Sequence, residues 1–189
     1  AKNLAGGRLI ADLRQHPDAV KAGLAAITES IVRFIDALKS TGAAGIFLAM
    51  QHASYDLLTE AEYREFGRPL DLQILQATEG MWFRLIHLHG TNVMFDMATD
   101  YPAELINWHD TETPPTLAEA MARTDKALCG GLRQWETMLR GTPESIQAEA
   151  DAALVATGGK RFVLGTGCVT PITTPTANLV AARQAVEPR

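Results

Sequence analysis

The stretch Phe83-Arg84-Leu85-Ile86-His87-Leu88-His89-Gly90 decides the fold. It is a short, largely apolar run that ends in polar and turn residues, which is the pattern of a buried strand. The run Gly45–Met50 (GIFLAM) has the same character and leads into Gln51 and His52. We therefore predict strands over residues 45–50 and 83–88, each with polar side chains at its carboxyl end.

Three further apolar runs predict strands, and helical patterns separate all five. The added strands are predicted over residues 105–108, 127–129 and 161–164. Apolar residues three or four apart predict a long helix from Pro17 to Lys39, with the stripe Val20, Leu24, Ile27, Ile31, Phe34 and Leu38. Capping boxes and prolines at first helical positions indicate other helices. These are predicted from Thr59 toward Gly80 with a break or kink at Pro69, over 93–99, from Thr116, from Thr142-Pro143, and from Thr174-Pro175 to about Val186.

The alternation of short strands with helical segments predicts a parallel α/β fold across residues 1–189, in a single domain. Five strands do not close a barrel, and a complete (β/α)8 barrel usually takes about 250 residues. Either the sheet is open and doubly wound, or the first strands of a barrel lie outside these 189 residues. The chain starts with alanine rather than methionine, so we expect it to begin inside a longer protein.

Composition excludes several classes of protein. The chain is 47% hydrophobic and carries a formal charge of −5 with no long run of either sign, which disfavours nucleic acid and anionic membranes as partners. No apolar stretch approaches the roughly 20 residues of a membrane span, and residues 1–4 lack the features of a signal peptide. The two cysteines are far apart, so a reducing, cytoplasmic setting is the default expectation.

Reactive side chains in parallel α/β folds gather at the carboxyl ends of strands, and this chain has ligand-type residues there. His87 and His89 are two apart at a strand end, so their side chains share one face. Cys168 follows the last strand and would complete a His2Cys set, leaving a fourth zinc position open as in catalytic sites. The competing interpretation is that the two histidines are unrelated, as most His-x-His pairs are.

The other candidate residues are each open to two interpretations. His109 and Asp110 are either a catalytic base with its orienting partner or a turn in which the aspartate caps a helix. Gln51 and His52 either bind substrate or begin a polar loop. Asp96 either faces the substrate pocket or caps a local turn.

Several motifs together resemble the uroporphyrinogen decarboxylase superfamily. The motifs follow one another in that superfamily's order and cover nearly the whole chain: Gly45–Ala53 with Leu57-Leu58-Thr59-x-x-x-Tyr63-x-x-Phe66-x-x-Pro69, His87-Leu88-His89-Gly90, Ile106-Asn107-Trp108, Gly130-Gly131, and Gly165-Thr166-Gly167-Cys168 with Thr174-Pro175-x-x-Asn178. Members of the superfamily are much longer at the amino terminus. The resemblance therefore implies the C-terminal portion of a (β/α)8 TIM barrel whose early strands are missing here.

The same motifs distinguish two branches of the superfamily. True uroporphyrinogen decarboxylases carry Gly-His-Gly after the last strand, and Thr166 stands where that histidine would be. The cobalamin-dependent methyltransferases use His-x-Cys and a later Gly-Cys to bind zinc, which activates a thiol. By resemblance, His87 and Cys168 match two of these ligands and His89 replaces the third, a cysteine. Imidazole in place of thiolate makes such a site less electron-rich.

The resemblance predicts a zinc-dependent methyltransferase with a thiol, alkoxide or methoxy substrate and a corrinoid protein, carrying cobalamin, as partner. The first alternative is a metal-free decarboxylase (a carboxy-lyase) in which Gln51, His52 and His109 bind carboxylates. The second is a non-catalytic barrel that holds a ligand. A partial barrel exposes strand edges, so we also expect the chain to dimerise, aggregate or need its missing half.

Overall fold

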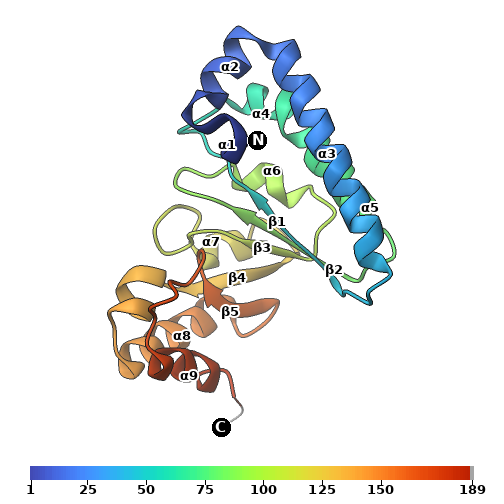
Figure 1. Ribbon diagram of the computed structural model, residues 1–189. Helices are drawn as coiled ribbons and strands as arrows, with labels where there is room; N and C mark the ends of the chain where they lie inside the picture. The colour runs from blue at the N-terminus through green and yellow to red at the C-terminus, as the bar shows by residue number, and fades with distance from the viewer. Residues whose placement is uncertain (188–189) are drawn as a thin grey trace.

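Five parallel strands form one sheet in the computed structural model, which describes residues 1–187 (Figure 1). The strands lie side by side in chain order. They are β1 (Gly45–Met50), β2 (Phe83–Leu88), β3 (Leu105–Asn107), β4 (Ala127–Leu132) and β5 (Phe162–Thr166). The order and the parallel pairing are those of consecutive units of a (β/α)8 barrel, so the chain folds as a partial barrel.

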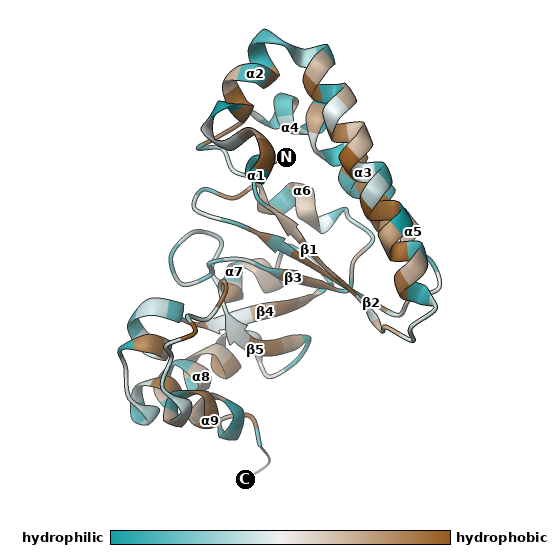
Figure 2. Ribbon diagram, viewed as in Figure 1, coloured by the Kyte–Doolittle hydropathy of each residue, from teal (hydrophilic) through white to brown (hydrophobic). Residues whose placement is uncertain are grey.

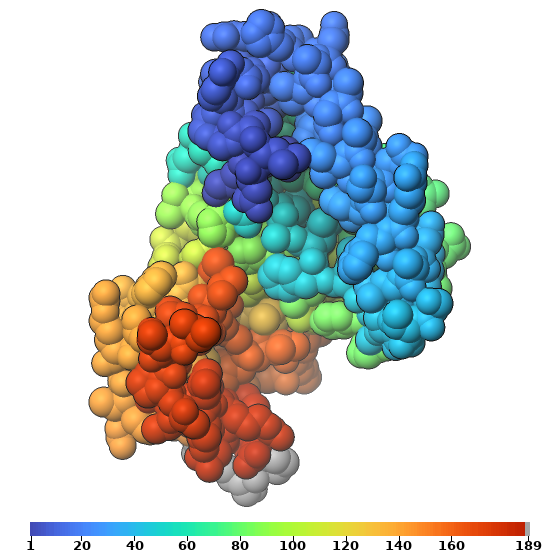
Figure 3. Space-filling model, viewed as in Figure 1, coloured from blue at the N-terminus to red at the C-terminus, as the bar shows by residue number. Residues whose placement is uncertain are grey.

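Helices connect the strands and cover the outer side of the sheet. Helices α3 (Pro17–Lys39) and α5 (Arg68–Ala77) pack together beside β1 and β2, whereas α8 (Pro143–Thr157) and α9 (Thr176–Gln184) pack together beside β4 and β5 (Figure 1). In the space-filling view, the first helices and the last one lie at opposite ends of the molecule (Figure 3). The helices are α1 (Lys2–Ala5), the 3-10 turn η1 (Gly6–Arg8), α2 (Leu9–Gln15), α3 (Pro17–Lys39), α4 (Glu60–Phe66), α5 (Arg68–Ala77), α6 (Phe95–Thr99), α7 (Leu117–Met121), the π-helical segment η2 (Gln134–Leu139), α8 (Pro143–Thr157) and α9 (Thr176–Gln184).

The alternation of side chains along the strands separates the helix-covered face from the barrel-interior face. Ile86, Ile106 and Leu128 are fully buried beneath the helices. On the other face, Phe47 of β1 is 60% exposed and Val163 of β5 is 46% exposed. In a closed barrel this face would be filled by side chains from all eight strands. Here its apolar side chains are partly open to solvent.

Local sequence explains the positions of the helices. Thr59 and Thr116 form the predicted capping boxes at the starts of α4 and α7. The predicted helix from Thr59 toward Gly80 is two helices, α4 and α5, with Gly67 between them and Pro69 in the first turn of α5. Among residues 1–187, no helix combines the length and apolar character that crossing a membrane requires.

The long helix α3 has the predicted bounds, but its buried stripe differs from the predicted one. Phe34 is 65% exposed, whereas its neighbour Ile35 is buried with Ile74 and Met81. Brown hydrophobic and teal hydrophilic residues intermingle along α3 (Figure 2). The rotation of α3 against α5 decides whether Phe34 or Ile35 is buried. The spacing of apolar residues in the sequence does not determine this rotation to within one residue.

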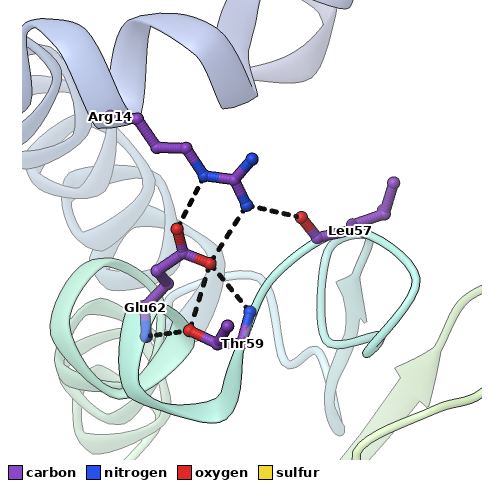
Figure 4. A network of polar contacts seen from close by, with 4 residues as sticks. All are labelled: Arg14, Leu57, Thr59 and Glu62. Carbon is purple, nitrogen blue, oxygen red and sulfur yellow. Dashed lines mark hydrogen bonds and ion pairs between the residues drawn. The ribbon is translucent and has the colours of Figure 1, made fainter.

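An exposed polar network ties α2 to the start of α4 (Figure 4). Arg14 donates from Nε to Glu62 Oε1 at 2.7 Å and from Nη2 to Glu62 Oε2 at 3.2 Å. Glu62 also accepts from the Thr59 backbone N–H at 2.8 Å, as the capping box requires. The Arg14 guanidinium and the Thr59 N–H lower the pKa of Glu62 to about 2. The amino-terminal helices, which the sequence did not predict, are held to the barrel in part by this network.

The structure also differs from the sequence-based prediction at β4 and in the segment that follows it. The strand continues through Gly130 and Gly131 to Leu132 instead of ending before the glycines. A Cβ on Gly131 would lie 2.6 Å from the Ala153 Cβ of α8, and the backbone φ of Gly131 is +98°, so both close helix–strand packing and the backbone conformation require glycine here. The π-helical segment η2 was also not predicted, since its sequence carries neither a cap nor a clear apolar stripe.

Candidate metal centre

Four ligand-type side chains meet at the carboxyl ends of β2, β3 and β5. His87, His89, His109 and Cys168 each offer one ligand atom, and these four atoms lie within 4.8 Å of one another. The ring centroids of the three histidines are 5.6 to 6.0 Å apart. The predicted trio of His87, His89 and Cys168 therefore comes together in space, and His109 joins it.

His87 is the most firmly placed member of the cluster. It lies within β2, is 2% exposed, and its Nδ1 is 2.6 Å from Asn107 Oδ1 on the neighbouring strand. The Asn107 Nδ2 group donates to the backbone oxygens of Cys129, at 2.8 Å, and Thr166, at 3.0 Å, which assigns its Oδ1 as the acceptor. The proton of His87 is therefore on Nδ1, and the buried Nε2 carries a lone pair with no protein partner.

Electrostatics keep two of the histidines neutral. The pKa of His87 is lowered to about 4, mainly by burial; the hydrogen bond to Asn107 opposes this shift, and the imidazoles of His109 and His89 add to it. Burial also lowers the pKa of His89, with smaller contributions from His109 and the Lys2 ammonium. A neutral imidazole is the form that ligates metal, so His87 and His89 are in the right state at neutral pH.

Cys168 reaches the histidines because the loop after β5 passes very close to the end of β3. Its Sγ is 3.7 Å from His89 Nδ1. A Cβ on Gly167 would lie 2.8 Å from His109 Cα and 3.0 Å from the Trp108 carbonyl oxygen. Only glycine fits this approach, so Gly167 sets the position of the thiol.

His109 and Asp110 do not form the predicted base–carboxylate pair. His109 Nδ1 faces Glu112 Oε2 at 3.3 Å, and its buried Nε2 has no protein partner. The Asp110 carboxylate accepts from the Gly131 backbone N–H, at 3.1 and 3.2 Å from its two oxygens. Burial raises the pKa of Asp110 to about 6. The aspartate thus anchors the end of β4, while Glu112 takes the place beside His109.

The predicted substrate-binding residues fall in two different places. Gln51 and His52 follow β1 and line a cavity of about 580 Å³ together with Lys2, Leu13 and Leu24. Burial lowers the pKa of His52, and the Lys2 ammonium and His89 add to the effect.

Asp96 does not join this site. It lies in the first turn of α6 with its side chain 77% exposed and pairs with Arg123 at 3.5 Å on the surface. Its environment is that of a solvated helix-start carboxylate.

The donor set suits a zinc ion. In tetrahedral zinc sites with Zn–N near 2.0 Å and Zn–S near 2.3 Å, neighbouring ligand atoms are about 3.3 to 3.7 Å apart. The His89–Cys168 separation of 3.7 Å already has this value, and the full cluster is within about 1 Å of it. Two buried imidazole nitrogens without partners, on His87 and His109, point to the same conclusion because such atoms are costly to leave unpaired. Nitrogen and thiolate donors favour zinc over magnesium or calcium.

Comparison with known proteins places the chain in a family. The family model described as uroporphyrinogen decarboxylase (URO-D) matches residues 5–188. The chain belongs to the uroporphyrinogen decarboxylase family.

One solved structure has a similar fold. A methyltransferase from Methanosarcina mazei is similar over 94% of this chain, with a TM-score of 0.80 and 24% sequence identity. The chain covers 51% of that protein and so spans about half its length. At this identity the likeness shows the shared fold. No curated protein matches the chain.

The sequence did not point to two residues that support the cluster. Asn107 ends β3 directly opposite His87, and Glu112 lies three residues after His109. The register between β2 and β3 would have exposed the role of Asn107, because it puts both side chains on one face of the sheet. For Glu112 the only signal was a carboxylate three residues beyond a histidine, which is common in any sequence.

Proposed function

We propose that this uroporphyrinogen decarboxylase family member is a zinc-dependent methyltransferase. The observation that carries the proposal is the cluster of three histidines and one cysteine with two buried, unpartnered imidazole nitrogens. The similarity of fold to a protein named as a methyltransferase is consistent with it. Membership of the family makes an enzyme the expected class of protein.

In this proposal His87, His89 and Cys168 hold the zinc ion. Bound zinc would supply a Lewis acid that lowers the pKa of a coordinated thiol or polarises an alkoxide or methoxy group. Asn107 orients His87 and fixes its tautomer, which is the usual task of a residue behind a metal ligand. Gln51 and His52 line the cavity described above and would contact the small-molecule substrate.

The proposed partner is a corrinoid protein that presents methylated cobalamin. A thiol activated on zinc needs a methyl donor. In this proposal methylated cobalamin on the partner would supply the methyl group, with the cobalt–carbon bond breaking as the sulfur–carbon bond forms. The exposed strand edges at β1 and β5 further suggest association with a second chain or with the remaining strands of the barrel. We expect residues 1–189 alone to self-associate, and sedimentation velocity over a hundredfold dilution checks this; a dilution-resistant monomer would contradict it.

The name of the matching family favours a second candidate, a carboxy-lyase that works without metal. Binding several carboxylates requires cationic side chains. Near the cluster, the Lys2 ammonium is the cation that lowers the pKa values of both His52 and His89, so it is the candidate to bind a carboxylate. This candidate predicts full activity in protein stripped of metal.

The testing experiment measures zinc by elemental analysis in protein purified without chelator. We expect about one zinc per chain in the wild type and its loss in His89→Ala and Cys168→Ala. His16→Ala is the matched control, because His16 is exposed and lies between α2 and α3, away from the cluster. Zinc-loaded protein is then assayed for methyl transfer between methylcobalamin and small thiols. Well-folded protein without metal would overturn the proposal and favour the carboxy-lyase or a non-catalytic ligand-binding barrel.

A further inference from the structure

We infer that His109 is a fourth protein ligand of this metal ion, held less firmly than His87 and exchangeable for an outside ligand. The inference rests on the metal site proposed above and adds to it. A His2Cys site leaves zinc open to substrate, whereas a His3Cys site is complete without substrate. The two arrangements therefore differ in how a thiol gains access to the metal.

The position of His109 is equivalent to that of the other ligands. Its ring centroid is 5.6 Å from that of His89 and 6.0 Å from that of His87, and His87 and His89 are themselves 5.7 Å apart. Its Nε2 is buried and without a protein partner, as is the Nε2 of His87. In both residues the other ring nitrogen is turned away from the cluster to a hydrogen-bonding side chain. This is the arrangement in which metal-binding histidines are usually held.

The two histidines differ in how firmly they are held. His87 belongs to β2, and its Nδ1 lies 2.6 Å from the buried amide of Asn107. His109 follows β3 in a turn, and its Nδ1 lies 3.3 Å from Glu112, whose side chain is 37% exposed. A long contact to a solvated carboxylate orients an imidazole less strictly than a short one to a buried amide. His109 should therefore be a weaker ligand than His87.

The backbone at His109 allows this exchange without moving the rest of the site. Gly167 packs against His109 Cα, and the His109 carbonyl oxygen accepts from the Glu112 and Thr113 N–H groups at 2.8 and 2.9 Å. Rotation of the His109 side chain alone would vacate its position. The class of ligand that takes this position is a thiol or another soft, compact donor, since the remaining ligands are two imidazoles and a thiolate.

The test uses Co²⁺ in place of zinc, because its visible spectrum reports the number and type of ligands. Wild type, His109→Ala, His109→Gln and His87→Ala are compared, with His16→Ala as the control and circular dichroism as the check on folding. We expect both His109 variants to bind one metal more weakly than the wild type but more tightly than His87→Ala. Their Co²⁺ spectra should differ from that of the wild type, and added imidazole should restore it in His109→Ala. Added 2-mercaptoethanol should bind the His109→Ala site at a concentration at least about tenfold lower than the wild-type site, which corresponds to about 1.4 kcal/mol.

The outcomes separate the two proposals. If the wild type binds metal and both folded His109 variants show wild-type affinity and spectrum, His109 is not a ligand and this inference alone is wrong. If the folded wild type binds no metal, the proposed metal site itself is wrong, and this inference is wrong with it.

Discussion

Two buried polar clusters in this molecule have opposite hydrogen-bonding states. Between α4, α5 and the segment after α6, Asp71 Oδ2 accepts from the hydroxyls of Tyr63, at 2.7 Å, and Tyr101, at 3.0 Å. At the carboxyl ends of the strands, the Nε2 atoms of His87 and His109 have no partner. A buried polar cluster that satisfies itself holds the structure together, whereas one that leaves atoms unpaired is suited to a ligand.

Desolvation acts on both clusters, with different consequences. Burial raises the pKa of Asp71 to about 6, although the two tyrosine hydroxyls oppose the shift. Burial lowers the pKa of His87 to about 4. In each case the neutral form is favoured. The neutral imidazole of His87 can bind metal, and the neutral Asp71 carboxyl group cannot do so while it holds its proton; both shifts make stability depend on pH.

The largest expected effect is at Asp71. Because its folded-state pKa is above the unfolded value of 3.8, the folded protein binds this proton more tightly, so stability is highest below about pH 4 and falls as pH rises to about 6. Asp71→Asn keeps an oxygen acceptor for Tyr63 and Tyr101 but removes the charge. We compare the effect of Asp71→Asn on the free energy of unfolding at two pH values. The effect should be more stabilising at pH 8 than at pH 4, by at most about 3 kcal/mol.

Urea denaturation at pH 4 and pH 8 measures this difference. Asp96→Asn is the control, because that carboxylate is exposed and should show little change at either pH. Equal effects of Asp71→Asn at both pH values would show that the carboxyl group is not desolvated in the way described.

The second prediction concerns the residue behind the metal ligand. Asn107→Ala removes the acceptor that fixes the tautomer of His87, and it leaves the ligands themselves in place. We expect zinc affinity to fall roughly 10- to 100-fold, measured by competition with a chromophoric chelator.

An unchanged zinc affinity in Asn107→Ala would mean that His87 is oriented by packing alone. Because Asn107 also donates to the Cys129 and Thr166 backbone oxygens, thermal unfolding of the metal-free variant is measured alongside to separate a loss of stability from a loss of affinity.

The smallest effect is expected at the exposed Arg14–Glu62 network, a solvated counterpart of the two buried clusters. Arg14→Ala should destabilise the protein only slightly at pH 7, because exposed ion pairs contribute little. The pKa of Glu62 is lowered to about 2. The stability that its ionised carboxylate contributes is therefore present above about pH 4.5 and is lost as pH falls toward 2. The difference between Arg14→Ala and wild type in urea should therefore shrink on acidification, and a difference that grows would contradict this sign.

Strand positions were the most predictable part of the fold. The bounds of β1 and β2 agree with the predicted strands, because each is a compact apolar run closed by turn residues. The predicted end of β4 was wrong because glycine was interpreted as a terminator, whereas Gly130 and Gly131 let the Asp110 side chain and helix α8 approach the strand closely. A Cβ at Gly130 would lie 2.2 Å from Asp110 Oδ1. Such contacts involve residues about 20 positions apart and leave no local pattern.

Sequence alone determined the family's order of motifs, the parallel α/β class and the placement of His87, His89, His109 and Cys168 at strand ends, because strand periodicity and turn residues act locally. Tertiary structure decided which of these side chains meet. It brought His109 into the cluster, assigned Asn107 and Glu112 as the residues behind the histidines, and sent Asp110 and Asp96 elsewhere. The physical reason is that strand register and the approach of Gly167 to the end of β3 set distances between segments remote in sequence.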